Sequence, residues 1–173
     1  TPPSTLAARH VASSGSPLSS AVAAGILAFG NYHGGDIETC MRCLQEGLSI
    51  HHAGISYEEV ARTLLEKHCG TSPTPPGFGH RVHTRDPRAA RLLQLAHELD
   101  LDGEHCRLLR VVERVLNEMP GRAQQPIPLN IDGAIAAVCA DLGFGPEIGN
   151  GLFIISRVAG LLAHSVEEKS RRS

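Results

Sequence analysis

The hydrophobic part of this chain is built from alanine and leucine, and this choice constrains its fold more than any other feature. Hydrophobic residues make up 42% of the 173 residues, but aromatic residues make up only 3% and tryptophan is absent. Alanine and leucine, both strong helix formers, outnumber the β-branched valine and isoleucine that favour strands. No segment alternates as a half-buried strand would. The sequence therefore predicts an all-α fold, long enough to enclose one sizeable core.

Helix-start signals and prolines divide the chain into expected helices. Ser4 is a suitable N-cap for the first helix, and Ser56 with Glu59 forms a capping box for the fourth. Residues 70–79 hold three prolines and three glycines and are expected to form a loop. The expected helices cover residues 4–13, 18–29, 36–48, 56–68, a segment from Asp86-Pro87 onward, 103–119, 130–142 and 151–168.

Charge and hydropathy exclude several classes of partner. The net charge is −2, which argues against binding to nucleic acid or to an acidic membrane surface. No stretch approaches the roughly 18–20 consecutive apolar residues of a spanning helix, and no signal-peptide pattern is present. We therefore expect neither a nucleic acid nor a membrane as partner.

The cysteines point to a reducing compartment. Their number, five, is odd, and their spacing forms no compact framework, so we expect free thiols and a cytoplasmic location. Cys40 and Cys43 form a Cys-x-x-Cys pair, but no second pair lies at a suitable spacing and the segment has a helical pattern. We expect these thiols to be inert and predict no metal site.

Three short stretches place titratable residues at the edges of glycine-rich or turn-rich segments. They are Asn31-Tyr32-His33-Gly34-Gly35, Gly77-Phe78-Gly79-His80 running on to Asp86-Pro87-Arg88, and Asn130-Ile131-Asp132-Gly133. Two histidines and one carboxylate can transfer a proton next to a carbonyl group, because one group takes the proton and the others stabilise the developing oxyanion. With Arg88 and Arg157, they predict acid–base chemistry on an anionic carbonyl substrate.

These motifs, in this order, resemble the citrate synthase family. The matching residues are His33-Gly34-Gly35, Gly77-Phe78-Gly79-His80, Asp86-Pro87-Arg88, Asn130-Ile131-Asp132, and Ser156-Arg157 followed by Gly160 and Ala163-His164. The resemblance implies a large helical domain, residues 1–44 and 129–173, with an inserted small acyl-CoA-binding domain, residues 45–128. It also implies a homodimer, for which the apolar helices 18–29 and 151–164 would suit the interface. Closure of the small domain would exclude water.

The resemblance assigns a role to each motif residue. Asp132 would be the base that removes a proton from the methyl group of an acyl thioester, and His33 would donate to the thioester oxygen. His80 would bind and protonate the keto oxygen of an oxaloacetate-like substrate. Arg88 and Arg157 would bind its carboxylates. The alternatives are that Asp132 only caps a helix, that His33 is a loop histidine bonded to backbone, and that the arginines form surface ion pairs. Arg157 lies among apolar residues, where a charge would need a partner.

The same resemblance implies that a coenzyme A thioester is a substrate and indicates which residues would bind it. No permanently bound cofactor is expected. The segment Pro76, Gly77, Phe78 and Gly79 would meet the adenine end of coenzyme A. Arg81 and Arg85 are candidates for its phosphates, with solvated surface charges as the alternative. There is no Walker A or Gly-x-Gly-x-x-Gly pattern.

Three details resemble the citryl-CoA lyases within the family, including the lyase module of ATP-citrate lyase. They are Gly133-Ala134-Ile135 after Asp132, a shortened segment between His80 and Arg88, and the run from Gly149 to Phe153. We therefore expect an enzyme that makes or cleaves the carbon–carbon bond between acetyl-CoA and oxaloacetate, with the lyase reaction favoured. A citrate or 2-methylcitrate synthase is the alternative.

A catalytically incompetent, truncated binding module is the alternative from another class. Relative to the family pattern, the sequence lacks an N-terminal portion with a further substrate-binding histidine, and its C-terminal arm is short. We therefore expect it to be part of a longer protein.

Overall fold

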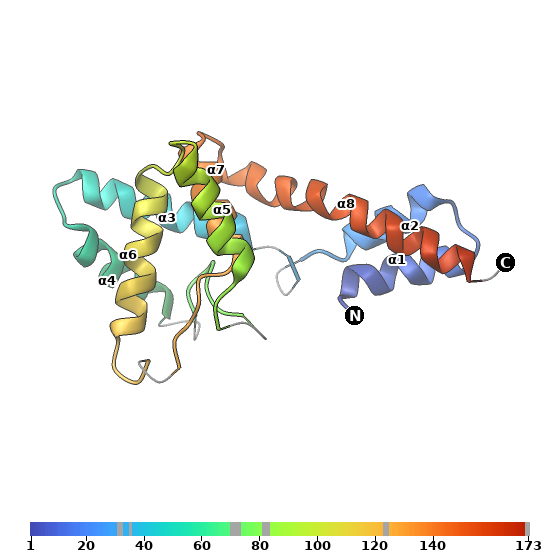
Figure 1. Cartoon of the computed structure of the whole chain (residues 1–173), viewed down its shortest axis with the longest axis horizontal. Helices are drawn as coiled ribbons and strands as arrows, with labels where there is room; N and C mark the ends of the chain where they lie inside the picture. The colour runs from blue at the N-terminus through green and yellow to red at the C-terminus, as the bar shows by residue number, and fades with distance from the viewer. Residues whose placement is uncertain (31–32, 35, 70–73, 81–83, 123–124, 172–173) are drawn as a thin grey trace. The chain divides into compact units, whose positions relative to one another are not determined.

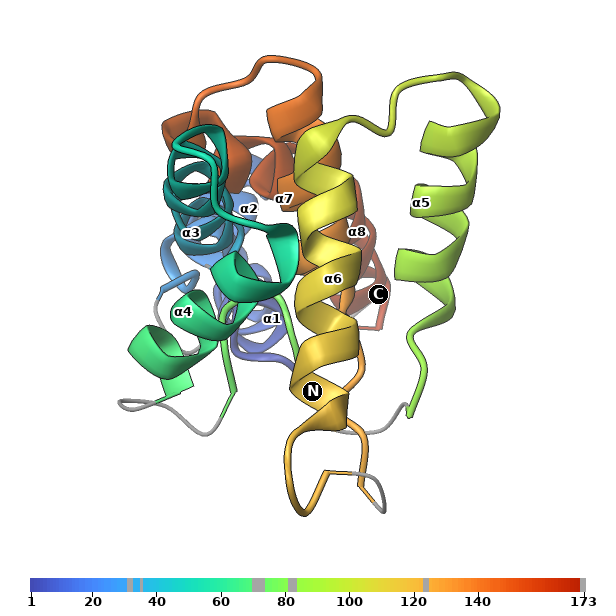
Figure 2. The same ribbon diagram turned by 90° about the vertical axis from the view of Figure 1, so that its left-hand side faces the viewer.

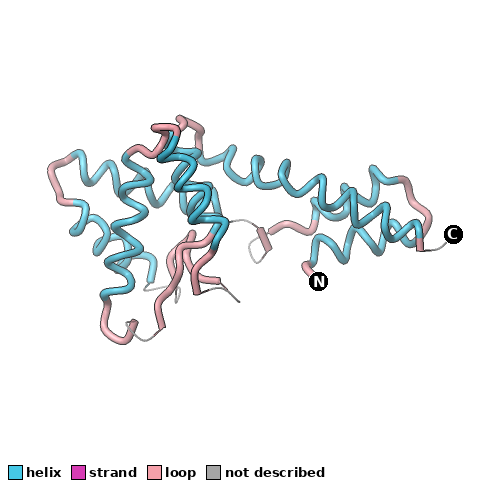
Figure 3. The backbone as a smooth tube through the Cα atoms, viewed as in Figure 1, coloured by secondary structure: helices cyan, strands magenta, loops and turns pink. Residues whose placement is uncertain are grey.

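The computed structural model describes residues 1–30, 33–34, 36–69, 74–80, 84–122 and 125–171. Within these ranges the secondary structure consists of helices joined by loops, with only isolated bridges of the strand type, such as Phe78 with Leu129. Figure 3 shows the helices in cyan and the connecting loops in pink. The predicted all-α fold class is confirmed.

The described residues contain eight helices (Figure 1). They are α1 Pro3–Ser13, α2 Leu18–Leu27, α3 Asp36–His52, α4 Tyr57–Cys69, α5 Pro87–Glu98, α6 Glu104–Glu118, α7 Ile131–Asp141 and α8 Pro146–Ser170. Their order follows the prediction. The last helix begins at Pro146 rather than near residue 151, because a proline at the first helical position lacks only an N–H group that would have no helical partner.

The capping residues explain where several helices begin. Ser56 and Glu59 form the predicted capping box, in which each side chain accepts a hydrogen bond from the other residue's backbone N–H at 3.3 Å. The prediction that Ser4 caps the first helix is wrong. Pro2 occupies the N-cap position of α1, and Ser4 lies fully buried inside the first turn. Its Oγ atom lies 2.8 Å from Nε2 of His33 instead.

The chain forms two compact units, Thr1–Gly35 with Asn150–Ser173 and Asp36–Gly149. In the first unit α1 packs against α2, and Gly25 of α2 lies against Leu161 of α8. In the second unit α3, α5 and α6 all pack against α7, and α4 packs against α3 and α6. Figure 2 shows α6 of this unit flanked by α4 and α5. The domain ranges 1–44, 45–128 and 129–173 stay a prediction.

Helix α7 can serve as the centre of the second unit because its side chains are small. Its buried residues are Gly133, Ala134, Ala136, Ala137, Val138, Cys139 and Ala140. Small side chains let three neighbouring helices approach the same axis closely. The alanine-rich composition of this segment thus has a direct structural consequence: it lets α7 lie among α3, α5 and α6, buried from Gly133 onward.

None of the helices that the structure describes is both long enough and apolar enough to cross a membrane.

A buried carboxylate fastens the far end of α7 to the start of α6. Asp141 Oδ2 accepts from the backbone N–H groups of Gly103 at 2.8 Å and Cys106 at 3.0 Å. Its Oδ1 accepts from the His105 backbone at 2.9 Å and lies 2.8 Å from His105 Nδ1. Burial by itself would raise the pKa of Asp141, but these hydrogen bonds outweigh it and lower the pKa from 3.8 to about 2.

Asp141→Asn is expected to lower the free energy of unfolding by about 2 kcal/mol at neutral pH, as the gap between the two pKa values implies. Because the folded-state pKa lies below the unfolded value, this stabilisation is present above about pH 4 and is lost as the pH falls toward 2. Urea unfolding of both proteins at several pH values should show their stabilities converging in acid. A difference that stays constant with pH would contradict this interpretation.

Candidate active site

His33 is held as an oriented ring in the first unit. Its Nε2 accepts a hydrogen bond from the Ser4 backbone N–H at 3.2 Å and lies 2.8 Å from Ser4 Oγ. Because a backbone N–H can only donate, Nε2 is an acceptor, and the proton of the neutral ring is therefore assigned to Nδ1. The ring stacks on Phe29 with centroids 5.2 Å apart. His33 is thereby set up to donate a hydrogen bond through Nδ1.

The loop that carries His80 is attached to the start of α7. The Asn130 backbone N–H donates to Gly77 O at 3.0 Å, and Asn130 Nδ2 donates to Gly79 O at 3.1 Å. Gly79 N–H donates to Pro128 O at 2.8 Å, and Gly77 N–H donates to Asp36 Oδ2 at 3.3 Å. His80 therefore follows a loop whose backbone is fixed from two sides.

Gly77 and Gly133 touch where this loop crosses α7. A Cβ atom on Gly133 would lie 2.5 Å from Gly77 O, closer than any real contact. Gly77 has a φ of +84°, and a Cβ there would lie 2.7 Å from both Cys40 Sγ and the Cα atom of Gly133. The glycine after Asp132, noted in the sequence as a lyase-like detail, thus lets the His80 loop lie directly on α7.

Gly133→Ala is therefore expected to destabilise the protein, although alanine favours helices by about 1 kcal/mol over glycine. The overlap with Gly77 O must push the loop away from α7, at a cost of roughly 1–3 kcal/mol in unfolding free energy. Gly151→Ala is the matched control, because outside its chain neighbours and its own helix backbone no atom of the chain lies within 4 Å of the Cβ added there. Chemical denaturation should place the two variants on opposite sides of the wild type; equal stabilities would contradict the steric interpretation.

Asp132 does not cap its helix. Asn130 is the N-cap of α7, and its Oδ1 accepts from the backbone N–H groups of Asp132 at 3.0 Å and Gly133 at 3.1 Å. The alternative that Asp132 serves only as the cap is therefore wrong. Its half-buried carboxylate stands in the first turn, where the helix dipole favours a negative charge.

Arg88 forms a two-pronged ion pair with Asp86. Arg88 Nε lies 3.0 Å from Asp86 Oδ1, and Nη2 lies 2.9 Å from Oδ2. Nη2 also lies 3.3 Å from His80 Nε2. Since a guanidinium only donates, Nε2 of His80 is the acceptor in this contact. Burial would raise the pKa of Asp86, but the hydrogen bonds from Arg88 and the charge of Arg88 hold that pKa below its usual range.

The exposure of the Arg157 side chain differs from what its sequence neighbours predict. The sequence places it among apolar residues, which predicted a buried charge with a partner. In the structure Arg157 is exposed on α8, and its Cζ atom lies 5.8 Å from the centroid of the Phe153 ring. The expected burial is not found in this chain: Ile155 and Ser156 beside it are exposed as well, so this stretch of α8 is uncovered. Its role as a carboxylate ligand stays a prediction.

The predicted site residues belong to both compact units. His33 and Arg157 lie in the first unit, whereas His80, Arg88 and Asp132 lie in the second. Sequence reasoning missed Ser4 as the partner of His33 and saw Asp86 only as a helix start. No local pattern could have found the Ser4 contact, since the two residues lie 29 positions apart.

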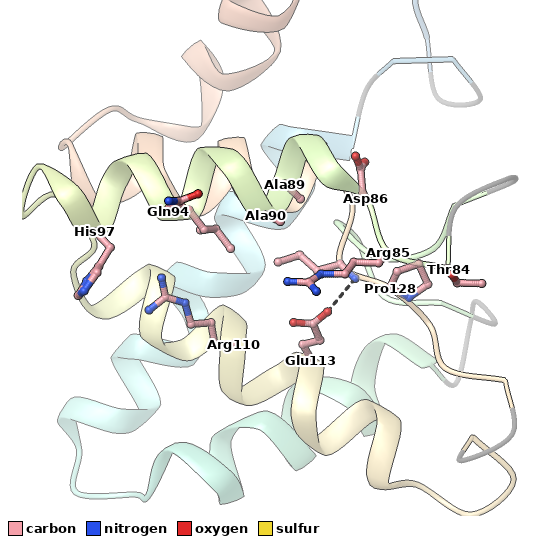
Figure 4. A pocket seen from close by; sticks show the side chains of 12 residues that line it. Thr84, Arg85, Asp86, Ala89, Ala90, Gln94, His97, Arg110, Glu113 and Pro128 are labelled. Atoms are coloured by element: carbon pink, nitrogen blue, oxygen red, sulfur yellow. Dashed lines mark hydrogen bonds between the residues drawn. The ribbon is translucent and has the colours of Figure 1, made fainter.

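Of the predicted coenzyme A segment, Gly77 and Phe78 are buried, Pro76 and Gly79 are half-buried, and Arg81 lies outside the described residues. Arg85 is exposed and borders a pocket of about 460 Å³ between α5 and α6 (Figure 4). Ala89 and Leu93 line its apolar part, and Arg110 and Glu113 stand on α6. None of the five predicted catalytic and carboxylate-binding residues lines this pocket.

The Cys40 and Cys43 thiols are poor nucleophiles. Burial raises the pKa of both, for Cys43 to about 12. Both therefore stay protonated at neutral pH, whereas the thiolate is the form that attacks and binds metals. Among the described residues, no group of three or more His, Cys, Asp or Glu side chains could hold a metal ion.

Comparison with known proteins shows which family this chain belongs to. Residues 1–173 match the family described as "Citrate synthase, C-terminal domain". Citrate synthase 2 of Bacillus subtilis (strain 168) is 33% identical over 171 residues, covering 95% of this chain and 42% of the relative. This chain therefore spans less than half the length of that relative.

Solved structures with similar folds belong to the same family. The citryl-CoA lyase from Hydrogenobacter thermophilus is 43% identical, with a TM-score of 0.84, covering 98% of this chain and 62% of that chain. Citrate synthase from Thermoplasma acidophilum, in a ternary complex with carboxymethyl coenzyme A and oxaloacetate, is 26% identical, with a TM-score of 0.76, covering 96% of this chain and 44% of that chain. The chain has the all-α citrate synthase-like fold and belongs to the citrate synthase family.

Proposed function

We propose that the protein makes or cleaves the carbon–carbon bond between acetyl-CoA and oxaloacetate, and that cleavage of citryl-CoA is its main reaction. The similarity to the Hydrogenobacter thermophilus citryl-CoA lyase, at 43% identity and a TM-score of 0.84, carries this proposal. The close crossing of Gly77 over Gly133 supports the choice of branch, because it gives the lyase-like Asp132-Gly133 pair a structural reason.

In this mechanism three side chains of the chain move or hold protons. In the condensing direction Asp132 removes a proton from the methyl group of acetyl-CoA, and His33 donates from Nδ1 to the thioester oxygen as negative charge develops there. His80 donates to the keto oxygen of oxaloacetate, which becomes the hydroxyl group of citryl-CoA. In cleavage His80 takes this proton back, the carbon–carbon bond breaks, and Asp132 returns a proton to the methyl carbon.

The remaining residues bind the two substrates. Arg88 and Arg157 pair with the carboxylates of oxaloacetate or citryl-CoA, because planar guanidinium groups match carboxylates in a two-pronged geometry. The segment Pro76–Gly79 contacts the adenine end of coenzyme A, and Arg81 and Arg85 bind its phosphates. Coenzyme A acts as a thioester substrate, with no permanently bound cofactor. The Thermoplasma acidophilum complex with carboxymethyl coenzyme A and oxaloacetate supports this pair of ligands.

We also propose that the protein is a cytoplasmic homodimer whose small domain, residues 45–128, closes over the acyl-CoA. The helices 18–29 and 151–164 would form the interface. Large apolar side chains are exposed there, among them Leu27 at 85% and Ile155 at 69%. Large apolar side chains left exposed on helices in this way are what a helix-packed protein–protein interface would cover.

Two other functions are alternatives to this proposal. A citrate or 2-methylcitrate synthase is favoured by the 33% identity to Bacillus subtilis citrate synthase 2. A catalytically incompetent binding module is the second. The chain keeps an acid–base residue at each of the three motif positions, namely Asp132, His33 and His80. This favours an enzyme over a binding module, because proton transfer requires these residue types.

Parallel assays on the complete protein separate these functions. Citryl-CoA cleavage is measured beside condensation of oxaloacetate with acetyl-CoA and with propionyl-CoA, and the oligomeric state is measured by light scattering. We expect a dimer in which citryl-CoA cleavage is the faster reaction. Condensation without cleavage would identify a synthase, and a preference for propionyl-CoA would identify a 2-methylcitrate synthase. No turnover by a folded dimer would favour the binding module.

A further inference from the structure

Asp86 is a fully buried carboxylate that joins the starts of two helices. Its side chain has 0% exposure, and it accepts four hydrogen bonds. Oδ1 accepts from the backbone N–H and from Nε of Arg88, both at 3.0 Å. Oδ2 accepts from Nη2 of Arg88 at 2.9 Å and from the backbone N–H of Ile131 at 3.1 Å. The same group therefore caps α5, holds the Arg88 side chain and anchors the first residue of α7.

Helix capping alone does not require this arrangement. An N-cap needs one acceptor oxygen, and asparagine serves in that position as well as aspartate does. Here two further bonds go to the Arg88 side chain and a fourth goes to another helix. Both carboxylate oxygens are used twice, so an amide nitrogen in place of Oδ2 would face two N–H donors.

The pairing fixes the plane of the Arg88 guanidinium. The Arg88 side chain is 55% exposed, and a long exposed side chain ordinarily samples several rotamers. Asp86 occupies the edge formed by Nε and Nη2, and Nη1 makes no hydrogen bond to any described residue. Nη2 also donates to His80 Nε2 at 3.3 Å, which places the proton of a neutral His80 ring on Nδ1.

Asp86 thus touches the immediate surroundings of three site residues. It binds Arg88 directly, it reaches His80 through Arg88, and it bonds to the residue just before Asp132. We propose that Asp86 is a positioning residue, which presents the Arg88 guanidinium to a substrate carboxylate in register with the base Asp132. The substrate part of this inference rests on the proposed function.

Asp86→Asn in the complete protein tests the inference, because asparagine keeps the helix cap but removes the charge and the second acceptor oxygen, which takes two of the four hydrogen bonds. Asp141→Asn is the matched control: it alters another buried carboxylate of the same unit, at the far end of α7. Calorimetry should show oxaloacetate binding weakened roughly 10- to 100-fold by Asp86→Asn, as expected for a misplaced binding group, and by less than about twofold in the control. Coenzyme A binding should change by less than about twofold in both variants. Equal effects of the two variants on oxaloacetate would mean that Asp86 is only structural and would overturn the inference.

A measurement without ligand separates this inference from the proposed function. In the wild type, the Nε–H of Arg88 should give a slowly exchanging nitrogen-15 NMR signal, assigned by its loss in Arg88→Lys. The signal should persist in Asp141→Asn and disappear in Asp86→Asn. Its absence from the wild type would overturn the positioning role, whatever the substrate is. If the signal behaves as expected but the wild type binds no oxaloacetate, the proposed function fails, and with it the substrate part of the inference.

Arg88→Lys also covers the case in which Asp86→Asn does not fold. Lysine keeps the positive charge but cannot form the two-pronged pair. It should weaken oxaloacetate binding by roughly tenfold or more while leaving coenzyme A binding unchanged. Unchanged oxaloacetate binding would overturn the inference.

Discussion

Asp132→Asn is expected to lower the rates of citryl-CoA cleavage and of condensation by roughly 10²- to 10⁴-fold, the usual contribution of a general base. An amide cannot take the proton from the methyl carbon or return it. The helix should stay intact, because Asn130 and not Asp132 caps α7. Steady-state kinetics in both directions, with circular dichroism to confirm folding, measure the effect.

The control for this variant is again Asp141→Asn. It removes a carboxylate from the other end of the same helix and should leave the rate within about twofold of the wild type, under conditions in which it is folded. If Asp132→Asn kept more than about a tenth of the wild-type rate, Asp132 would not be the base.

His33→Ala is the second change with a large expected effect, a loss of roughly 10²- to 10³-fold in turnover. The ring is held by Ser4, which leaves Nδ1 as the proton-bearing atom that faces the developing oxyanion in the proposed mechanism. Turnover of citryl-CoA by the complete protein is the readout, with substrate affinity measured separately.

Ser4→Ala provides a graded comparison for His33. Alanine removes Oγ but keeps the backbone N–H that donates to Nε2 at 3.2 Å. The loss should therefore be much smaller, on the order of tenfold or less. Equal losses in Ser4→Ala and His33→Ala would mean that the histidine acts mainly through its contact with the serine and not as a donor to substrate.

Local signals predicted most of the fold. Capping residues and prolines act within a few positions of themselves, so the capping box at Ser56 and the start of α5 after Asp86 could be read directly. Ser4 shows the limit of such reading. It has the residue type of an N-cap, but Pro2 takes that position and the serine is used by a histidine 29 residues away.

The candidate site was predictable as a set of residue types but not as an arrangement. Motif order pointed to His33, His80, Arg88 and Asp132. The contacts that orient them depend on tertiary packing: Gly77 lies on Gly133, and Asp86 connects α5 to α7. The exposure of Arg157 could not be read either, because an apolar segment does not reveal which face of a helix is covered.

Hydrogen–deuterium exchange at the methyl group of acetyl-CoA tests proton transfer by Asp132 most directly. The complete protein is incubated in D₂O with acetyl-CoA and a dicarboxylate that cannot react, and deuterium in the methyl group is followed by NMR. We predict exchange with the wild type and none above background with Asp132→Asn. Equal exchange by both proteins, or no exchange by a wild type that does cleave citryl-CoA, would contradict the role of Asp132 as the base.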